Sequence, residues 1–215
     1  MMRSIKTLII GIAVVLSGYA TAQASPGVWG VSGSTNFNDG TNYVLGWGFT
    51  PRDNMDIAAL GVYAAMDFST GQRTFTQDHQ VGLYDANQNL LASTTVSNRD
   101  GLYGMFRFHN LDTAQHLDGG STYYLAAAMG ADQFFYDVAG FTVNQHINFG
   151  QFAYTVSDTL AFPGTADPGV LGYFGPNFET TPVPEPSTLL LVGLGLTGVV
   201  FIRKRTWILH KECRQ

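Results

Sequence analysis

Cysteine is almost absent from this chain of 215 residues: the single one, Cys213, lies close to the end. Residues 25–182 contain none, so no disulfide within that segment can stabilise its fold, even in an oxidising compartment. The segment is 158 residues long, which is enough for one domain with a sizeable hydrophobic core. We therefore expect one domain that is stabilised by packing and hydrogen bonds.

Lysine is missing from residues 25–182, and Glu179 is the only glutamate there. Four arginines stand against thirteen aspartates and this glutamate, which gives the segment a net charge of −10 with histidine neutral. The phosphates of nucleic acids and of anionic lipids would find few cationic partners on such a surface. We therefore expect no nucleic-acid partner, whereas divalent cations and neutral sugars are compatible with this charge.

The motifs of several enzyme classes are also missing. The sequence contains no G-x-S-x-G segment and no glycine-rich phosphate loop between a strand and a helix. A carboxylate pair for glycoside hydrolysis would have to consist of two aspartates, and most aspartates here lie beside turn-forming residues. We expect a non-enzymatic protein, and the alternative is a secreted polysaccharide hydrolase that uses an Asp pair.

Residues 1–24 have the features of a secretory signal peptide. Arg3 and Lys6 precede an apolar stretch at residues 8–16, and Ala22-Gln23-Ala24 matches the A-x-A cleavage pattern. This order predicts export, with cleavage after residue 24.

Three unlike segments follow one another near the other end, at residues 183–205. Pro184 and Pro186 break any preceding element, and residues 187–202 then run for 16 positions without a charge. As a helix this run would cover about 24 Å of a hydrocarbon core of about 30 Å, so it predicts a short transmembrane helix. Arg203, Lys204 and Arg205 should stay in the cytoplasm, which makes residues 206–215 a cytoplasmic tail.

Pro184, Glu185 and Pro186, the apolar run and the cations at 203–205 together resemble the PEP-CTERM sorting signal of Gram-negative bacteria. The resemblance implies recognition and cleavage by a membrane enzyme of the exosortase type. It also implies transient residence in the inner membrane, followed by release to the cell surface or into the exopolysaccharide.

Residues 25–162 predict an all-β domain, a single antiparallel β-sandwich of the jelly-roll or immunoglobulin-like kind. The hairpin formed by HQVGLYD and NLLASTTV around residues 85–89 is its clearest unit. This pattern also resembles a bacterial exported β-sandwich domain of unknown function. Residues 163–182 are rich in proline and glycine and predict a stalk. The other predicted strands are residues 28–31, 43–50, 57–66, 102–109 and 121–129, with two more in 140–156, broken near 148–150.

Two kinds of binding residue stand out. Carboxylate and amide oxygens on turns suit calcium, and the candidates are Asn36, Asn38, Asp39, Asp132 and Asp137. Aromatic rings suit sugars, and Phe134, Phe135 and Tyr136 are consecutive, so they cannot all face one side of a strand. We therefore expect part of this trio to be exposed and to bind an extracellular polysaccharide.

Overall fold

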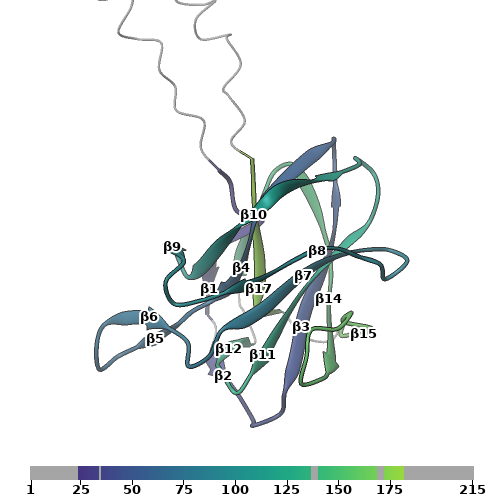
Figure 1. The fold of residues 1–215 in the computed structure, drawn as a ribbon. Helices are drawn as coiled ribbons and strands as arrows, with labels where there is room; N and C mark the ends of the chain where they lie inside the picture. The colour runs from purple at the N-terminus through teal and green to yellow at the C-terminus, as the bar shows by residue number, and fades with distance from the viewer. Residues whose placement is uncertain (1–23, 34, 137–139, 169–171, 182–215) are drawn as a thin grey trace, which may run out of the picture. The chain divides into compact units, whose positions relative to one another are not determined.

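The computed structural model describes residues 24–33, 35–136, 140–168 and 172–181, and every regular element among them is a β-strand (Figure 1). Within these described residues, no helix could cross a membrane. The predicted signal peptide, sorting helix and tail lie outside them. The unit Ala24–Thr181 contains all the strands and their core, so we treat it as a domain that can fold by itself.

Two antiparallel sheets form a β-sandwich, which confirms the predicted fold class. The larger sheet has the order β15 (Thr165–Ala166), β14 (Ile147–Val156), β3 (Tyr43–Pro51), β11 (Tyr123–Gly130), β7 (His79–Asp85), β8 (Leu90–Val96). The second sheet has the order β17 (Pro176–Thr180), β4 (Met55–Tyr63), β10 (Phe106–Leu117), β9 (Gly101–Tyr103).

Three small sheets complete the domain (Figure 1). One pairs β1 (Val28–Ser32) with β13 (Gly140–Val143), and another is the hairpin of β5 (Ala65–Asp67) and β6 (Gln72–Thr74). The third has the order β16 (Tyr173–Phe174), β12 (Phe134–Tyr136), β2 (Thr35–Phe37). This third sheet borders the candidate site.

Strand β3 shows how alternation builds the core. Trp47 and Phe49 are fully buried on one face, and the Trp47 ring donates a hydrogen bond from Nε1 to the Pro176 carbonyl at 2.9 Å. On the other face, a Cβ atom at Gly46 would lie 2.6 Å from Cγ of Pro163. Glycine is therefore required where the segment around Pro163 crosses the outside of the sheet, as the glycine pattern of this strand indicates.

A second, smaller core lies on that outer face. Val44, Tyr84 and Ala126 are buried there, and Phe162 packs its ring against the rings of Tyr84 and Tyr124. The segment before β15 thus covers the sheet instead of leaving it.

The predicted stalk is wrong, because strands β15, β16 and β17 all lie within residues 163–182. Strand β17 pairs with β4, and the side chains of Phe174 and Phe178 are fully buried. The amide of Thr180 donates to the carbonyl of Ser25 at 3.0 Å, so the two ends of the domain lie side by side. Sequence composition missed β17 because its short segment contains a proline and three polar residues.

The predicted hairpin is confirmed as β7 and β8, with the Asp85 carboxylate accepting the amides of Asn87 and Asn89 in the turn. Three of the predicted strands are divided differently. The predicted strand 57–66 is split between β4, which ends at Tyr63, and β5, which begins at Ala65 and belongs to another sheet. The predicted strand 102–109 is interrupted by a turn in which Gly104 has φ +60°, a conformation that favours glycine. The strands within 140–156 separate before Ile147, and residues 149–152 form a bulge inside β14.

Candidate functional site

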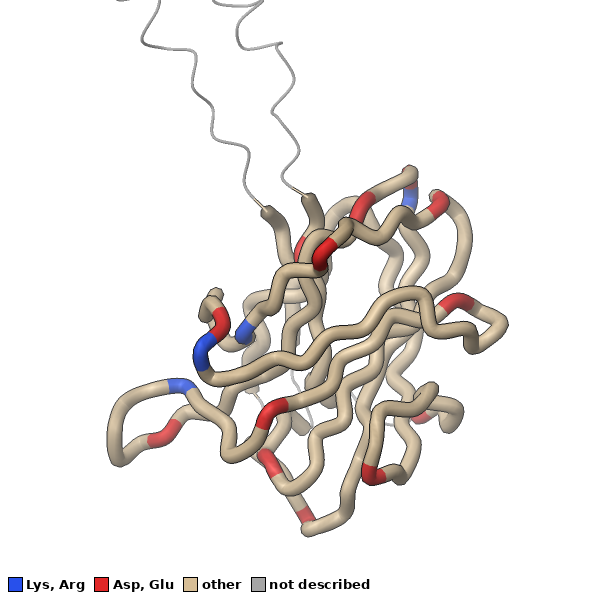
Figure 2. The backbone as a smooth tube through the Cα atoms, viewed as in Figure 1, with Lys and Arg blue, Asp and Glu red and all other residues tan. Residues whose placement is uncertain are grey.

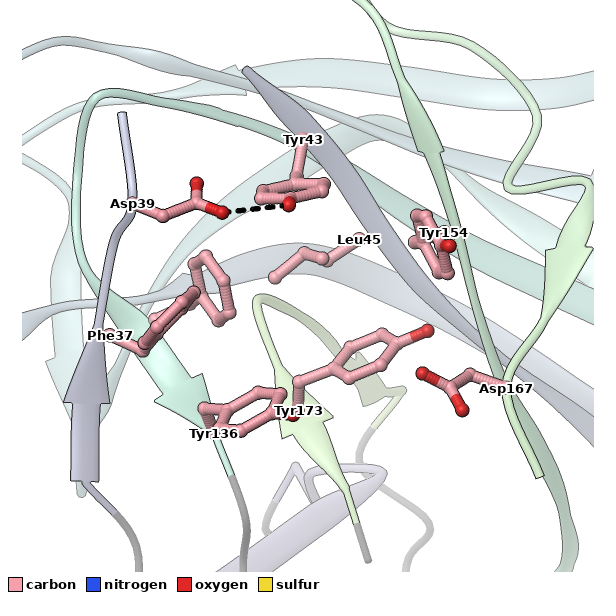
Figure 3. Close-up of a pocket in the computed structure, with 9 residues that line it drawn as sticks. Phe37, Asp39, Tyr43, Leu45, Tyr136, Tyr154, Asp167 and Tyr173 are labelled. Carbon is pink, nitrogen blue, oxygen red and sulfur yellow. Dashed lines mark hydrogen bonds between the residues drawn. The ribbon is translucent and has the colours of Figure 1, made fainter. Parts of the chain in front are cut away.

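A pocket of about 210 Å³ lies at one end of the sandwich, where β3 and β14 meet the small sheet of β2, β12 and β16 (Figure 3). Its described lining comprises six aromatic rings, two carboxylates and one leucine, without lysine or arginine. The lining residues are Phe37, Asp39, Tyr43, Leu45, Phe134, Tyr136, Tyr154, Asp167 and Tyr173. Together these residues form the aromatic pocket.

Strand register brings these residues together from distant parts of the sequence. Tyr154 on β14 lies opposite Leu45 on β3, and Tyr136 on β12 lies opposite Tyr173 on β16. Phe134 precedes Tyr136 by two positions, so the two side chains share one face of β12. The pocket therefore depends on tertiary pairing and not on a local motif.

The rings meet edge to face. Tyr43 and Tyr154 have centroids 6.0 Å apart at 78°, and Tyr154 and Tyr173 have centroids 6.3 Å apart at 79°. Phe134 contacts Tyr43 in the same way at 6.0 Å and 82°. Such pairs stabilise one another, so the walls of the pocket are rings held roughly at right angles.

Asp39 is an ionised acceptor at the edge of the pocket. Its carboxylate accepts the Thr41 amide at 2.9 Å. It also accepts the Tyr43 hydroxyl at 3.0 Å (Figure 3). The bond from the Thr41 amide, helped by that from Tyr43, lowers the pKa of Asp39, and the bond to Asp39 raises the pKa of Tyr43. At neutral pH, Asp39 is thus charged and Tyr43 is a neutral donor.

The hydroxyl group of Tyr173 is buried in the pocket wall without a hydrogen-bond partner among the described residues. The residue is 3% exposed. Burial raises the pKa of Tyr173, and the nearby Asp167 raises it further, so the phenol stays neutral. A buried donor without a partner costs about 1–3 kcal/mol. A bound ligand could remove this cost by accepting the hydrogen bond.

The trio at residues 134–136 is divided between two environments. Phe134 and Tyr136 line the pocket, whereas Phe135 packs on Tyr63 with ring centroids 4.1 Å apart. Part of the trio was expected to be exposed, but Phe134 and Phe135 are buried at 3% and 8% exposure, and Tyr136 is only partly exposed. Alternation does direct them to opposite faces, but both faces of β12 are covered.

Among the described calcium candidates, Asn38 and Asp132 are in contact, because Nδ2 of Asn38 donates to the Asp132 carbonyl at 3.0 Å. The side-chain oxygens of the candidates accept hydrogen bonds from other groups of the protein. The side-chain oxygen of Asn36 accepts the Tyr63 hydroxyl at 2.7 Å, and that of Asn38 accepts the Gly40 amide at 2.6 Å. Asp137 lies outside the described residues. Within the described part of the chain, no three His, Cys, Asp or Glu side chains gather as a metal site. Calcium binding stays a prediction.

Asp132 instead organises a buried polar cluster. Its carboxylate accepts the amides of Thr76 at 2.8 Å and Gln77 at 3.1 Å. The Nε2 atom of His79 lies 3.2 Å away but outside good hydrogen-bond geometry, so this is an electrostatic contact. The other nitrogen of His79, Nδ1, lies 2.8 Å from the Ala128 carbonyl and donates to it. Asp132 therefore ties the loop before β7 to the end of β11.

Substitution Asp132→Asn should lower the free energy of unfolding by about 2–3 kcal/mol, because a buried histidine and two partly buried backbone amides lose their anionic partner. Burial alone would raise the pKa of Asp132, but the contact with His79 and the bonds from Thr76 outweigh it and leave the pKa lowered. The carboxylate thus stabilises the fold above its unfolded-state pKa of about 3.9, and this contribution is lost as pH falls through the folded-state value.

Urea unfolding at pH 7 and at pH 3 measures both effects, with Asp78→Asn, at an exposed position nearby, as the control. The gap between Asp132→Asn and the wild type should be large at pH 7 and smaller at pH 3. Equal stability of the two substituted proteins at pH 7 would show that the cluster contributes nothing.

A comparison with known protein families concerns the C-terminal part of the chain. Residues 182–205 match the family described as the PEP-CTERM protein-sorting motif. The chain carries a PEP-CTERM sorting signal. A search of the curated proteins finds no match.

The PEP-CTERM motif marks the chain as an exported, surface-sorted protein that passes through a membrane-anchored state before cleavage. It implies recognition by an exosortase-type processing enzyme. The match contains all the predicted sorting residues: Pro184, Glu185, Pro186, Arg203, Lys204 and Arg205. These residues lie outside the described part of the structure, so the sorting helix stays a prediction.

Proposed function

We propose that the domain of this PEP-CTERM protein is a non-enzymatic module that binds extracellular polysaccharide at the cell surface or in the surrounding matrix. The observation that carries the proposal is the aromatic pocket, which is lined by six rings and two carboxylates and includes Tyr173, whose buried hydroxyl has no partner among the described residues. Ring faces pack on the apolar faces of sugars, while carboxylates and phenols bond to their hydroxyls. The volume of about 210 Å³ lies below the ~300–1,000 Å³ typical of pockets for drug-sized ligands, which favours a single sugar ring.

A glycan array probed with residues 24–181 tests this function. Substitution Tyr154→Ala should weaken binding to any captured glycan by about tenfold or more, because it removes one wall of the pocket. Tyr103→Ala is the matched control, since Tyr103 is 48% exposed on β9 and does not line the pocket. Melting temperatures show whether each protein is folded. The proposal fails if the folded wild type captures no glycan, or if both substitutions weaken binding equally.

The hydrolase alternative rests on a specific observation, namely that Asp39 and Asp167 line the same pocket. A glycosidase needs one carboxyl with a raised pKa as the general acid, but the pKa of Asp39 is lowered. Burial raises the pKa of Glu179, yet this residue lies on β17 and does not line the pocket. Asp167 would have to be the acid, so turnover of a captured glycan that Asp167→Asn abolishes would establish the hydrolase.

A further inference from the structure

We propose that the aromatic pocket prefers a sugar ring that carries a protonated amine, such as a glucosamine residue without its acetyl group. This inference rests on the proposed function, because it assigns the substrate class of the same pocket. Three independent features of the described lining support it: its charge, its rings and its unpaired hydroxyl.

The charge of the lining has one sign. Asp39 and Asp167 contribute two carboxylates, and no cation of the described residues lines the pocket. The surroundings repeat this pattern, since acidic positions are spread over many loops while basic positions are few (Figure 2). A uronate or a sulfated sugar would be repelled here, whereas an ammonium group would be attracted at partly desolvated sites.

The rings also favour a cation. The faces of tyrosine and phenylalanine carry negative potential, and a cation within about 6 Å of a ring centroid is attracted to it. Tyr43, Tyr154 and Tyr173 form consecutive walls, and Tyr136 and Phe37 close another side with centroids 5.0 Å apart. Figure 3 shows the carboxylates of Asp39 and Asp167 on different sides of this ring cluster. A protonated amine could therefore contact a ring and a carboxylate together.

The unpaired hydroxyl of Tyr173 is a donor that a polar ligand could satisfy once the side chains that enclose it move. Buried side-chain donors in proteins almost always have a partner, and this one has none among the described residues. A sugar hydroxyl or ring oxygen could accept its hydrogen bond while the amine of the same ring lies beside a carboxylate. An N-acetyl group would remove the positive charge and add three heavy atoms within about 210 Å³. The geometry thus favours the deacetylated ring.

Calorimetric titration of residues 24–181 at about pH 6 and low salt tests this preference with four probes. These are the methyl glycosides of glucosamine, N-acetylglucosamine and glucose, and tetramethylammonium chloride. We expect the amino sugar to bind about tenfold more tightly than either neutral sugar, and its affinity to fall as salt screens the carboxylates. Asp39→Asn and Asp167→Asn should each reduce this preference. Asp112→Asn, which removes the same charge at an exposed position on β10, should leave it unchanged.

Each outcome decides the matter. The amino-sugar preference, with its loss in both pocket substitutions, supports the proposal. Equal binding of all three sugars overturns it but leaves the sugar-binding function intact. Tetramethylammonium binding as tightly as the amino sugar makes the pocket a general ammonium site and overturns the sugar assignment. If no probe binds and the glycan array is also blank, the proposed function fails with it.

Discussion

Substitution Phe178→Ala is expected to lower the free energy of unfolding by about 3–5 kcal/mol, the usual cost of truncating a buried phenylalanine. The Phe178 side chain is fully buried, and its ring lies 5.0 Å from that of Phe49 and 5.9 Å from that of Trp47. Removing it leaves a cavity between the two sheets, because Trp47 and Phe49 are fixed in β3. Domains are stable by only about 5–15 kcal/mol, so the loss takes a large share of the total.

Urea unfolding of residues 24–181 measures this loss, and Phe68→Ala is the matched control. Phe68 is 87% exposed, so its truncation should change stability by no more than about 0.5 kcal/mol. The melting temperature should fall by about 10 °C for Phe178→Ala and hardly at all for Phe68→Ala. If both proteins unfold at the same urea concentration, β17 is not part of the sandwich and residues 163–182 form a stalk after all.

That experiment bears on what sequence alone could reveal. The β7–β8 hairpin was predictable because its signal is local, with alternating apolar residues on both sides of an Asx-rich turn. Strand β3 was also predictable from a local signal, because Leu45 and Trp47 alternate with Gly46 and Gly48. Strand β17 has neither signal. It is a strand because it pairs with β4 and buries Phe178, and these are tertiary facts.

The candidate site, too, could be predicted from the sequence only in part. Tyr43 on β3 lies many strands before Tyr154 on β14 and Tyr173 on β16 in the sequence, and only the order of the sheets places them in one pocket. The aromatic content indicated a sugar-binding site, but not which rings would form it. Phe134 and Tyr136 were identified by their spacing, yet their environment depends on β2 and β16, which have few sequence signals.

Asp132 shows that the environment of a polar residue cannot be predicted from its sequence neighbours alone. An aspartate that follows Gly130 and Ala131 in a turn is typical of solvent-exposed loops, which made it a calcium candidate. Its carboxylate is instead buried against His79 and two backbone amides. Nothing in the local sequence shows that a histidine more than fifty positions away needs an anionic partner.

Substitution of Pro184, Glu185 and Pro186 by alanine should abolish sorting without unfolding the domain, because these residues lie within the matched motif and outside Ala24–Thr181. A motif that the processing enzyme does not recognise leaves segment 187–202 attached, and these 16 uncharged, mostly apolar residues with cations behind them hold the protein in the membrane. We therefore expect the uncleaved chain in the membrane fraction, at its larger mass, with the melting temperature of the isolated domain unchanged.

Cell fractionation, immunoblotting and mass spectrometry of the released protein measure this outcome. Deletion of residues 206–215 is the control, because those residues follow the matched segment, and release should then proceed as in the wild type. Release of the alanine protein in normal amount and size would contradict a role for these three residues in sorting. Retention of both proteins would show that release needs the tail as well as the three motif residues, since the membrane segment itself is intact in each.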